Sequence, residues 1–265
     1  MENDTFVDRG IGTVADHVDA SALQQICDIF FLENTEGGLK NRANSLISKA
    51  LASQGDNIRN LKLSTIGLIC FENEGIKGAN LCRCVWRKSK KNQYGNVEQT
   101  TFMRHKDVTQ CPFGAIAFYF FYRWHIGDEP WPDFMERQLW YDIYALKGST
   151  PTKPMLYSHQ YSAIKWQHQA LGIQTTVKTQ SGRKAAATAE NEGAHGESVD
   201  KHGHWATKSQ NGAYANDVVP WDVVRVLAGF GPESGQYYIP RDVELPHKLR
   251  QKLFPKLDGS WHEML

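Results

Sequence analysis

The chain has 265 residues, of which 41% are hydrophobic and 22% are charged, and its formal net charge at pH 7 is +1. This length and apolar content suit one large mixed-fold domain, and no apolar run is long enough to span a membrane. The odd set of five cysteines favours reduced thiols inside the cell over a disulfide framework.

Hydrophobic periodicity predicts an α+β fold that is mostly helical, with a small antiparallel sheet. A first amphipathic helix starts after Asp19 or Ser21, either of which can cap it, and carries apolar residues through Phe31. A second repeats the pattern from Leu39 and ends near Gly55. We expect an N-terminal tail over residues 1–18, one domain over 19–258 and a C-terminal tail over 259–265.

A buried strand and a basic hairpin come next. Residues 66–71 are predicted to form the strand, and the alternation over 80–103 predicts a hairpin that turns at 90–96. A cluster of basic residues gathers around this hairpin, and such a cluster can contact phosphates. Its members are Arg83, Arg87, Lys88, Lys90, Lys91, Arg104 and Lys106. A solvated hairpin without a partner is the alternative, and residues 87–91 can also be interpreted as a nuclear import signal.

The rest of the chain is predicted to be helical with long loops. Pro112 opens a helix whose aromatic residues suit a core better than a surface for base stacking. Further helices are expected over 136–146, 158–171, 183–190 and 218–230, with a last short helix from Pro246.

The segment from Val177 to Tyr214 carries the most informative chemistry. It contains Arg183, then His204 beside Trp205, then Tyr214. A guanidinium matches two phosphate oxygens with its planar fork of donors, and ring N–H groups can stabilise charge that develops on a phosphate. A tyrosine hydroxyl can displace a sugar oxygen and form a covalent phosphotyrosine. These residues are the parts needed to attack a phosphodiester without a metal.

With Arg59 and Lys90 upstream, this order of residues resembles the arginine, lysine, arginine, histidine or tryptophan, tyrosine series of tyrosine recombinases. The flanking motifs over 90–95, 103–107, 111–119 and 227–230 resemble the crypton-type recombinases of fungal mobile elements. They also resemble the DNA-binding domain of the large subunit of the yeast centromere-binding factor. The resemblance runs from about residue 19 to 258, and its specificity comes from the ordered set.

The resemblance implies a tyrosine-recombinase catalytic-domain-like fold and assigns roles to individual residues. The implied catalytic set is Arg59, Lys90, Arg183, His204 and Tyr214, with Lys90 protonating the leaving oxygen. The implied DNA-binding set is Arg87, Lys88, Lys91, Arg104, Lys106, Gln180 and Trp205.

Two departures from the family pattern point away from catalysis. Gln180 stands where the family usually has histidine, and an amide cannot exchange a proton near neutral pH. Only a short segment precedes the first expected helix, so we expect the helical core-binding domain of the family to be missing.

Two hypotheses follow from these departures. The chain is a nuclear DNA-binding protein on a recombinase scaffold, impaired or inactive in strand cleavage, or it is an active recombinase that uses Tyr214. Double-stranded DNA is the expected partner in both cases. A homo-oligomer and a partner that supplies the core-binding domain stay open, and no membrane partner is expected.

No cofactor is expected, because the chain has no cofactor-binding loop. A metal site is not favoured either. His195, His202 and His204 form a possible cluster, but no paired Cys-x-x-Cys supports it, and Cys82 with Cys84 does not fit an ordinary zinc knuckle.

Overall fold

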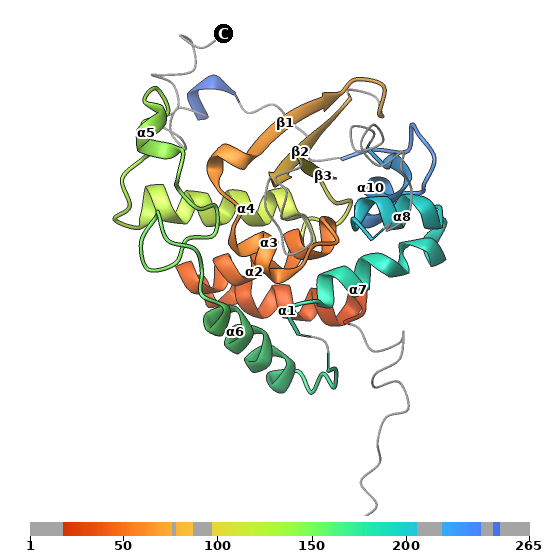
Figure 1. The fold of residues 1–265 in the computed structure, drawn as a ribbon, viewed down its shortest axis with the longest axis horizontal. Helices are drawn as coiled ribbons and strands as arrows, with labels where there is room; N and C mark the ends of the chain where they lie inside the picture. The colour runs from red at the N-terminus through yellow and green to blue at the C-terminus, as the bar shows by residue number, and fades with distance from the viewer. Residues whose placement is uncertain are drawn as a thin grey trace, which may run out of the picture.

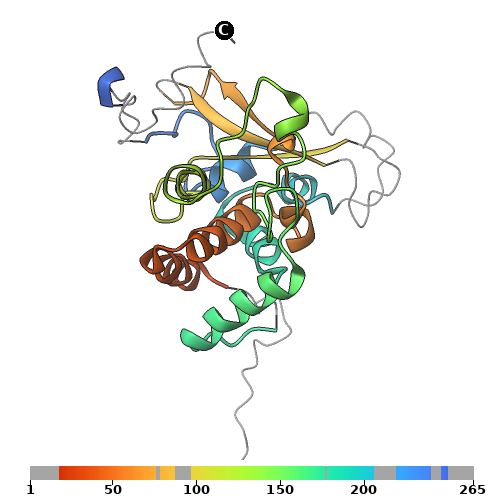
Figure 2. The same ribbon diagram turned by 90° about the vertical axis from the view of Figure 1, so that its left-hand side faces the viewer.

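The computed structural model describes residues 18–75, 78–86, 97–176, 178–205, 219–239 and 246–249. It confirms an α+β fold that is mostly helical and has one small antiparallel sheet. Figures 1 and 2 both show the sheet toward one end of the molecule, with α1, α2 and α6 toward the other. Among the helices in these ranges, none combines the length and the apolar character needed to cross a membrane.

The first two predicted helices are confirmed. Helix α1 (Ala20–Glu33) is capped by Asp19, whose carboxylate accepts from the backbone N–H of Ala22 at 2.7 Å. Helix α2 (Glu36–Ala50) is capped in the same way by Thr35. Its apolar side chains lie in the main core beside α4 (Pro112–Phe121), which opens on proline as predicted. Helix α2 is therefore buried on several sides and forms the centre of the helical layer.

The sheet has the order β1-β2-β3, formed by β1 (Ile66–Phe71), β2 (Ala79–Trp86) and β3 (Glu98–Met103). Both pairs are antiparallel, so the predicted hairpin is confirmed; its turn lies outside the described residues. Alternate residues of β2 enter different clusters. Cys82, Cys84 and Trp86 join the main core, whereas Leu81 packs in a second cluster that includes α10 (Trp221–Leu227).

The prediction that the 66–71 strand is buried was wrong. Leu68 in β1 is 71% exposed, although Ile66 in the same strand packs against the main core. β1 is an edge strand, since β2 is its one neighbour in the described sheet. An apolar run alone does not distinguish an edge strand from a central one.

The remaining named helices are short, apart from α6, which has 14 residues. They are α3 (Gly55–Arg59), η1 (Leu63–Thr65), the π-helical turn η2 (Tyr122–Ile126), α5 (Arg137–Trp140), α6 (Tyr157–Ala170), α7 (Ser181–Ala187), η3 (Thr188–Glu192) and α8 (Gly196–His202).

Several predicted boundaries shift. Gly55, expected near the end of the second helix, begins α3 instead. The helix predicted over 183–190 starts at Ser181 and becomes 3-10 helical at Thr188. In the helix predicted over 218–230, Pro220 is the N-cap, so the regular part starts at Trp221.

The helix predicted over 136–146 is wrong beyond Trp140. The chain there pairs with the segment that follows α3: the N–H of Ala145 donates to the carbonyl of Leu61 at 2.8 Å, and the N–H of Leu63 donates to the carbonyl of Ile143 at 2.8 Å. Long-range backbone pairing therefore overrides the local helical pattern and fixes the chain just after Arg59.

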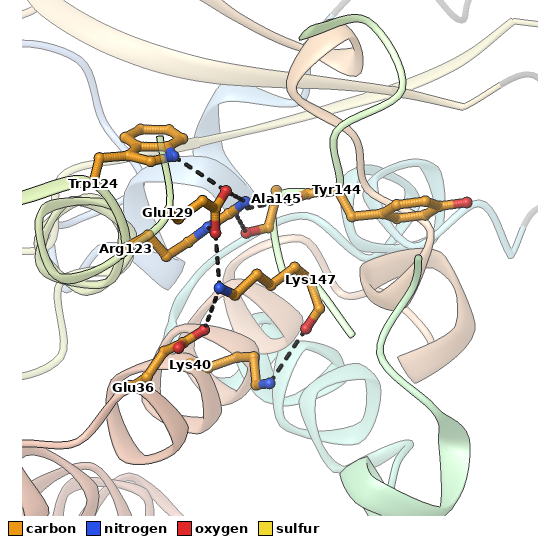
Figure 3. Close-up of polar contacts among 8 residues, drawn as sticks. All are labelled: Glu36, Lys40, Arg123, Trp124, Glu129, Tyr144, Ala145 and Lys147. Carbon is orange, nitrogen blue, oxygen red and sulfur yellow. Dashed lines mark hydrogen bonds and ion pairs between the residues drawn. The ribbon is translucent and has the colours of Figure 1, made fainter. Parts of the chain in front are cut away.

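A buried arginine holds this paired segment in place (Figure 3). Arg123 of η2 is 1% exposed and donates to the carbonyls of Tyr144 and Ala145 at 2.9 and 3.0 Å. Its Nε also donates to the Glu129 carboxylate at 3.0 Å. The Arg123 guanidinium thus connects η2, which follows α4, to the segment that pairs with Leu61.

Glu129 is shared between two cations. Lys147 Nζ lies 2.7 Å from Glu129 and 3.0 Å from Glu36 at the start of α2. Burial raises the pKa of the Glu129 carboxyl, but hydrogen bonds from Arg123 and Lys147 outweigh burial and lower the pKa below its ordinary value. The carboxylate is therefore ionised in the folded protein, and it neutralises a buried arginine.

We predict that Glu129→Gln lowers the free energy of unfolding by about 3 kcal/mol, because Arg123 then keeps an uncompensated buried charge. Urea denaturation near pH 7 measures it. Because folding lowers the Glu129 pKa, this carboxylate stabilises the wild type above its unfolded pKa, and the contribution is lost as the pH falls through the folded value. Asp142→Asn is the control, since the exposed pair of Asp142 with Lys62 contributes less than about 1 kcal/mol. Equal losses of unfolding free energy in Glu129→Gln and Asp142→Asn would contradict the role of Glu129 as the counter-ion of buried Arg123.

Candidate functional site

Arg59 is the last residue of α3, and its side chain is only 12% exposed. Its Nη2 donates to the Asp56 carboxylate one turn earlier at 2.8 Å, and its Nη1 donates to the side-chain oxygen of Gln160 in α6. The guanidinium also lies over the Tyr157 ring, 5.3 Å from the ring centre. Among the described residues these contacts use two of its five N–H donors, so the group is fixed while the other donors have no described partner.

Arg183 lies in the first turn of α7. Its Nη2 donates to the carbonyl of Gly203 at 3.3 Å, and its guanidinium lies 5.1 Å from the centre of a Trp205 ring. Burial lowers the pKa of Arg183, but an arginine stays protonated in a folded protein. The Arg183 guanidinium is therefore held by Gly203 and Trp205, which follow α8.

The preceding glycine brings α7 against α2. A Cβ added at Gly182 would lie 2.5 Å from the backbone carbon of Ser48, so only glycine fits this contact without a shift of one helix. The position of Arg183 is thus set by backbone packing as well as by its own contacts.

His204 and Trp205 follow the end of α8 in a tight turn. His204 has a left-handed backbone, with φ of 52°, and the N–H of Trp205 donates back to the carbonyl of Asp200 at 2.8 Å. The Trp205 ring lies directly on Gly203, where a Cβ would come within 2.3 Å of it. His204 Nε2 and Trp205 Nε1 are both buried and have no hydrogen-bond partner among the described residues. Buried polar atoms of this kind call for an explanation, and a ligand would satisfy them.

Electrostatics keep the His204 ring neutral near pH 7. Burial lowers the pKa of His204 below its ordinary value; Glu98 raises it, and the Arg183 cation lowers it further. Arg183 therefore supplies the positive charge of this cluster, and the two rings supply neutral nitrogen atoms.

Two hydrogen bonds attach this cluster to the rest of the site. The N–H of Gly55, at the start of the Arg59 helix, donates to the carbonyl of Thr179 at 3.1 Å, just ahead of α7. His202 Nε2 donates to the carbonyl of Ala50 at the end of α2 at 2.9 Å, and His202 Nδ1 lies 3.3 Å from the Thr100 hydroxyl. The elements that carry Arg59, Arg183 and His204 are thus joined directly or through α2.

Residues 23–264 match the family described as the centromere DNA-binding protein complex CBF3 subunit, domain 2. The chain belongs to this family. No curated protein sequence matches it.

Solved recombinase structures share the fold of this CBF3-subunit domain. One is described as an FLP recombinase and Holliday junction complex, with a TM-score of 0.53 and 13% identity over 82% of this chain and 54% of that one. Another is a point mutant of Flpe with a DNA Holliday junction, with a TM-score of 0.52 and 12% identity over 90% of this chain and 57% of that one. The chain thus spans about half the length of these recombinases, and the likeness confirms the predicted tyrosine-recombinase-like fold.

In this family member, the predicted site residues divide into three groups. Arg183, His204 and Trp205 form one cluster, and Arg59 lies on a helix hydrogen-bonded to the segment before Arg183. Gln180, Arg104 and Lys106 are described, and Gln180 and Lys106 are exposed. A third group lies outside the described residues and comprises Arg87, Lys88, Lys90, Lys91 and Tyr214.

The histidines considered as metal ligands have other surroundings. Burial lowers the pKa of His202 to about 4, so the ring is neutral and links α2 to β3. The backbone N–H of His195 donates to Asp222. The described ranges contain no group of three histidine, cysteine or acidic side chains placed to hold a metal ion.

Sequence reasoning missed two residues that surround Arg59. Gln160 and Tyr157 lie about 100 residues later in the chain and contact its guanidinium through α6. A glutamine on a helix gives no periodic or compositional sign of such a contact. Only the burial of Gln160 distinguishes it, and burial of a polar side chain is visible in the fold alone.

We predict that Gly182→Ala destabilises the protein by about 1 to 3 kcal/mol, because the added methyl group meets the α2 backbone. Urea denaturation measures the loss. Gly37→Ala is a matched control in α2, since a Cβ there has only the Thr35 hydroxyl at 3.8 Å. We expect this control to be neutral or stabilising, as alanine favours a helix over glycine. A Gly182→Ala variant as stable as the control would contradict the packing of α7 on α2.

Proposed function

We propose that this chain binds duplex DNA, and that Arg59 and Arg183 hold the phosphate backbone. One observation carries the proposal: two partly buried guanidinium groups lie on helices that the hydrogen bond between Gly55 and Thr179 brings together, beside two buried ring nitrogens with no partner among the described residues. Arginine forks match phosphate oxygens, and ring N–H groups add neutral donors. The family description, which names a centromere DNA-binding complex, supports the same function and a nuclear location.

The proposal extends to the predicted basic hairpin. Arg87, Lys88, Lys90 and Lys91 would contact the DNA backbone from the turn between β2 and β3. Exposed Lys106, in the segment after β3, and Arg104 would extend the same basic surface. Gln180 is exposed directly before α7 and would add a neutral donor near Arg183. Since the net charge is only +1, binding would depend on this local concentration and not on the field of the whole protein.

We also propose that the chain is related to crypton-type recombinases. A further part of the proposal is that a partner supplies the rest of a clamp around the DNA. The chain spans about half the length of the recombinases it resembles. We propose that a second copy or another chain supplies contacts on the opposite side of the DNA.

Duplex binding is tested by fluorescence anisotropy with a labelled duplex between about 50 and 200 mM salt. We predict that Arg59→Ala and Arg183→Ala each reduce affinity about tenfold and lower the slope of log affinity against log salt by about 0.9. Arg137→Ala is the control, since Arg137 is an exposed arginine of α5, which Figure 1 shows away from α7 and α8. A flat salt dependence of the wild type would contradict the proposal.

Strand cleavage is the second candidate function, and the Arg183, His204 and Trp205 cluster favours it. Two of its ring nitrogens face no described partner and could stabilise a pentavalent phosphate. In this reaction the Tyr214 hydroxyl would lose its proton to water as its oxygen forms a bond to phosphorus, the bond from phosphorus to the 5′ oxygen would break, and protonated Lys90 would give a proton to that 5′ oxygen. Gln180 argues against efficient cleavage, because it cannot exchange a proton.

A nicked, labelled duplex separates the two functions. If the chain only binds DNA, we predict a shifted band on a native gel and no covalent band on a denaturing gel, for both the wild type and Tyr214→Phe. A covalent band that disappears in Tyr214→Phe would instead establish the cleavage reaction.

A further inference from the structure

Gln160 is almost completely buried, at 1% exposure, and its amide contacts the guanidinium of Arg59. Because an arginine can only donate, the amide oxygen of Gln160 must face it. The amide nitrogen donates to the side-chain oxygen of Asn44 in α2 at 2.7 Å. The orientation of the amide is therefore set at both ends, by a buried residue of the central helix and by Arg59.

Glycine at position 55 makes room for this amide. A Cβ added at Gly55 would lie 2.6 Å from the amide oxygen and 3.0 Å from the amide nitrogen of Gln160. The same amide nitrogen lies 3.5 Å from the carbonyl of Gly55. The start of α3 thus lies directly against the side chain that binds the arginine at its end.

The charge of the arginine depends on what kind of group accepts from it. A carboxylate at position 160 would pair with Arg59 and cancel its charge, whereas an amide accepts a hydrogen bond and leaves the charge in place. The carboxylate that does contact Arg59 is Asp56, which is 55% exposed, so solvent screens that pair. Arg59 is therefore fixed by a neutral, buried acceptor on one side and by a screened anion on the other.

We propose that Gln160 is a positioning residue for DNA binding, which fixes the Arg59 guanidinium for a phosphate without neutralising it. This inference rests on the proposed function, because it assigns Arg59 a phosphate to bind. Gln160 itself would not touch the DNA. Its effect would pass entirely through Arg59.

The test is Gln160→Glu, which keeps the shape of the side chain and adds one negative charge. Asn44 can turn its amide to donate to the new carboxylate, and Arg59 gains an ion pair, so we expect a thermal midpoint at or above that of the wild type. Duplex affinity should fall about tenfold, with a salt slope lower by about 0.9. A purely structural role would move stability and affinity in the same direction.

The double variant Arg59→Ala with Gln160→Glu tests whether the effect passes through Arg59. We expect Gln160→Glu to lower affinity far less in the Arg59→Ala background than the tenfold it costs in the wild type, because the added charge then has no cation to cancel. Gly55→Ala is a second route to the same contact, since its methyl group pushes the amide off the arginine. We expect a severalfold loss of affinity from it, again absent in the Arg59→Ala background.

The outcomes separate this inference from the function on which it rests. If Arg59→Ala weakens binding and both Gln160→Glu and Gly55→Ala bind like the wild type, the inference is wrong and the function stands. If Gln160→Glu unfolds the protein, Gly55→Ala with its double variant decides. If Arg59→Ala binds DNA like the wild type, the proposed role of Arg59 fails and the inference fails with it.

Discussion

Helix α2 is the constraint on which the candidate site depends, because each part of the site contacts a different residue of it. Asn44 orients the amide that holds Arg59. The backbone of Ser48 meets Gly182, one residue before Arg183. The carbonyl of Ala50 accepts from His202, two residues before His204. A single buried helix thus aligns three segments that are far apart in the sequence.

This arrangement explains how two arginines can be fixed without losing their charge. Arg123, deep in the fold, is neutralised by Glu129 and donates to backbone carbonyl groups. Arg59 and Arg183 instead contact an amide, aromatic rings, a carbonyl and one screened carboxylate. Neutral partners restrict the side chains while leaving the positive charge for an anion, which reduces the entropy lost when a phosphate binds.

The described residues of the site include the groups that can bind a phosphate but only some of the groups needed to cleave a phosphodiester. The guanidinium groups and the ring nitrogens can hold an anion as they stand. Proton transfer requires more, because burial and Arg183 keep His204 neutral and Gln180 has no proton to exchange. Cleavage would therefore rest on Lys90 and Tyr214, whose roles stay predictions. This asymmetry is the physical reason to place DNA binding ahead of recombination.

Local patterns predicted the elements that depend on local forces. The cap of α1, the apolar faces of α1 and α2, the proline that opens α4 and the alternation in β2 all appear as expected. The failures come from long-range contacts. Residues 143–145 leave the predicted helix because they pair with 61–63, and Leu68 is exposed because its strand lies at an edge.

The residues of the candidate site also divide into those that a local reading of the sequence predicts and those that depend on long-range contacts. The ordered set of Arg59, Arg183 and His204 was readable from residue types and their order along the chain. Gln160 was not, since its importance comes from burial and from Asn44 across the fold. Residue order along the chain predicts which groups would carry the chemistry, whereas the groups that hold them are set by packing.

The most direct test of the central claim is an NMR titration of the arginine side chains with duplex DNA. If Arg59 and Arg183 hold the phosphate backbone together, their Nε–Hε signals will shift with one common midpoint, and the signal of exposed Arg137 will stay in place. A duplex that binds while Arg59 and Arg183 keep their free-state signals would contradict the account.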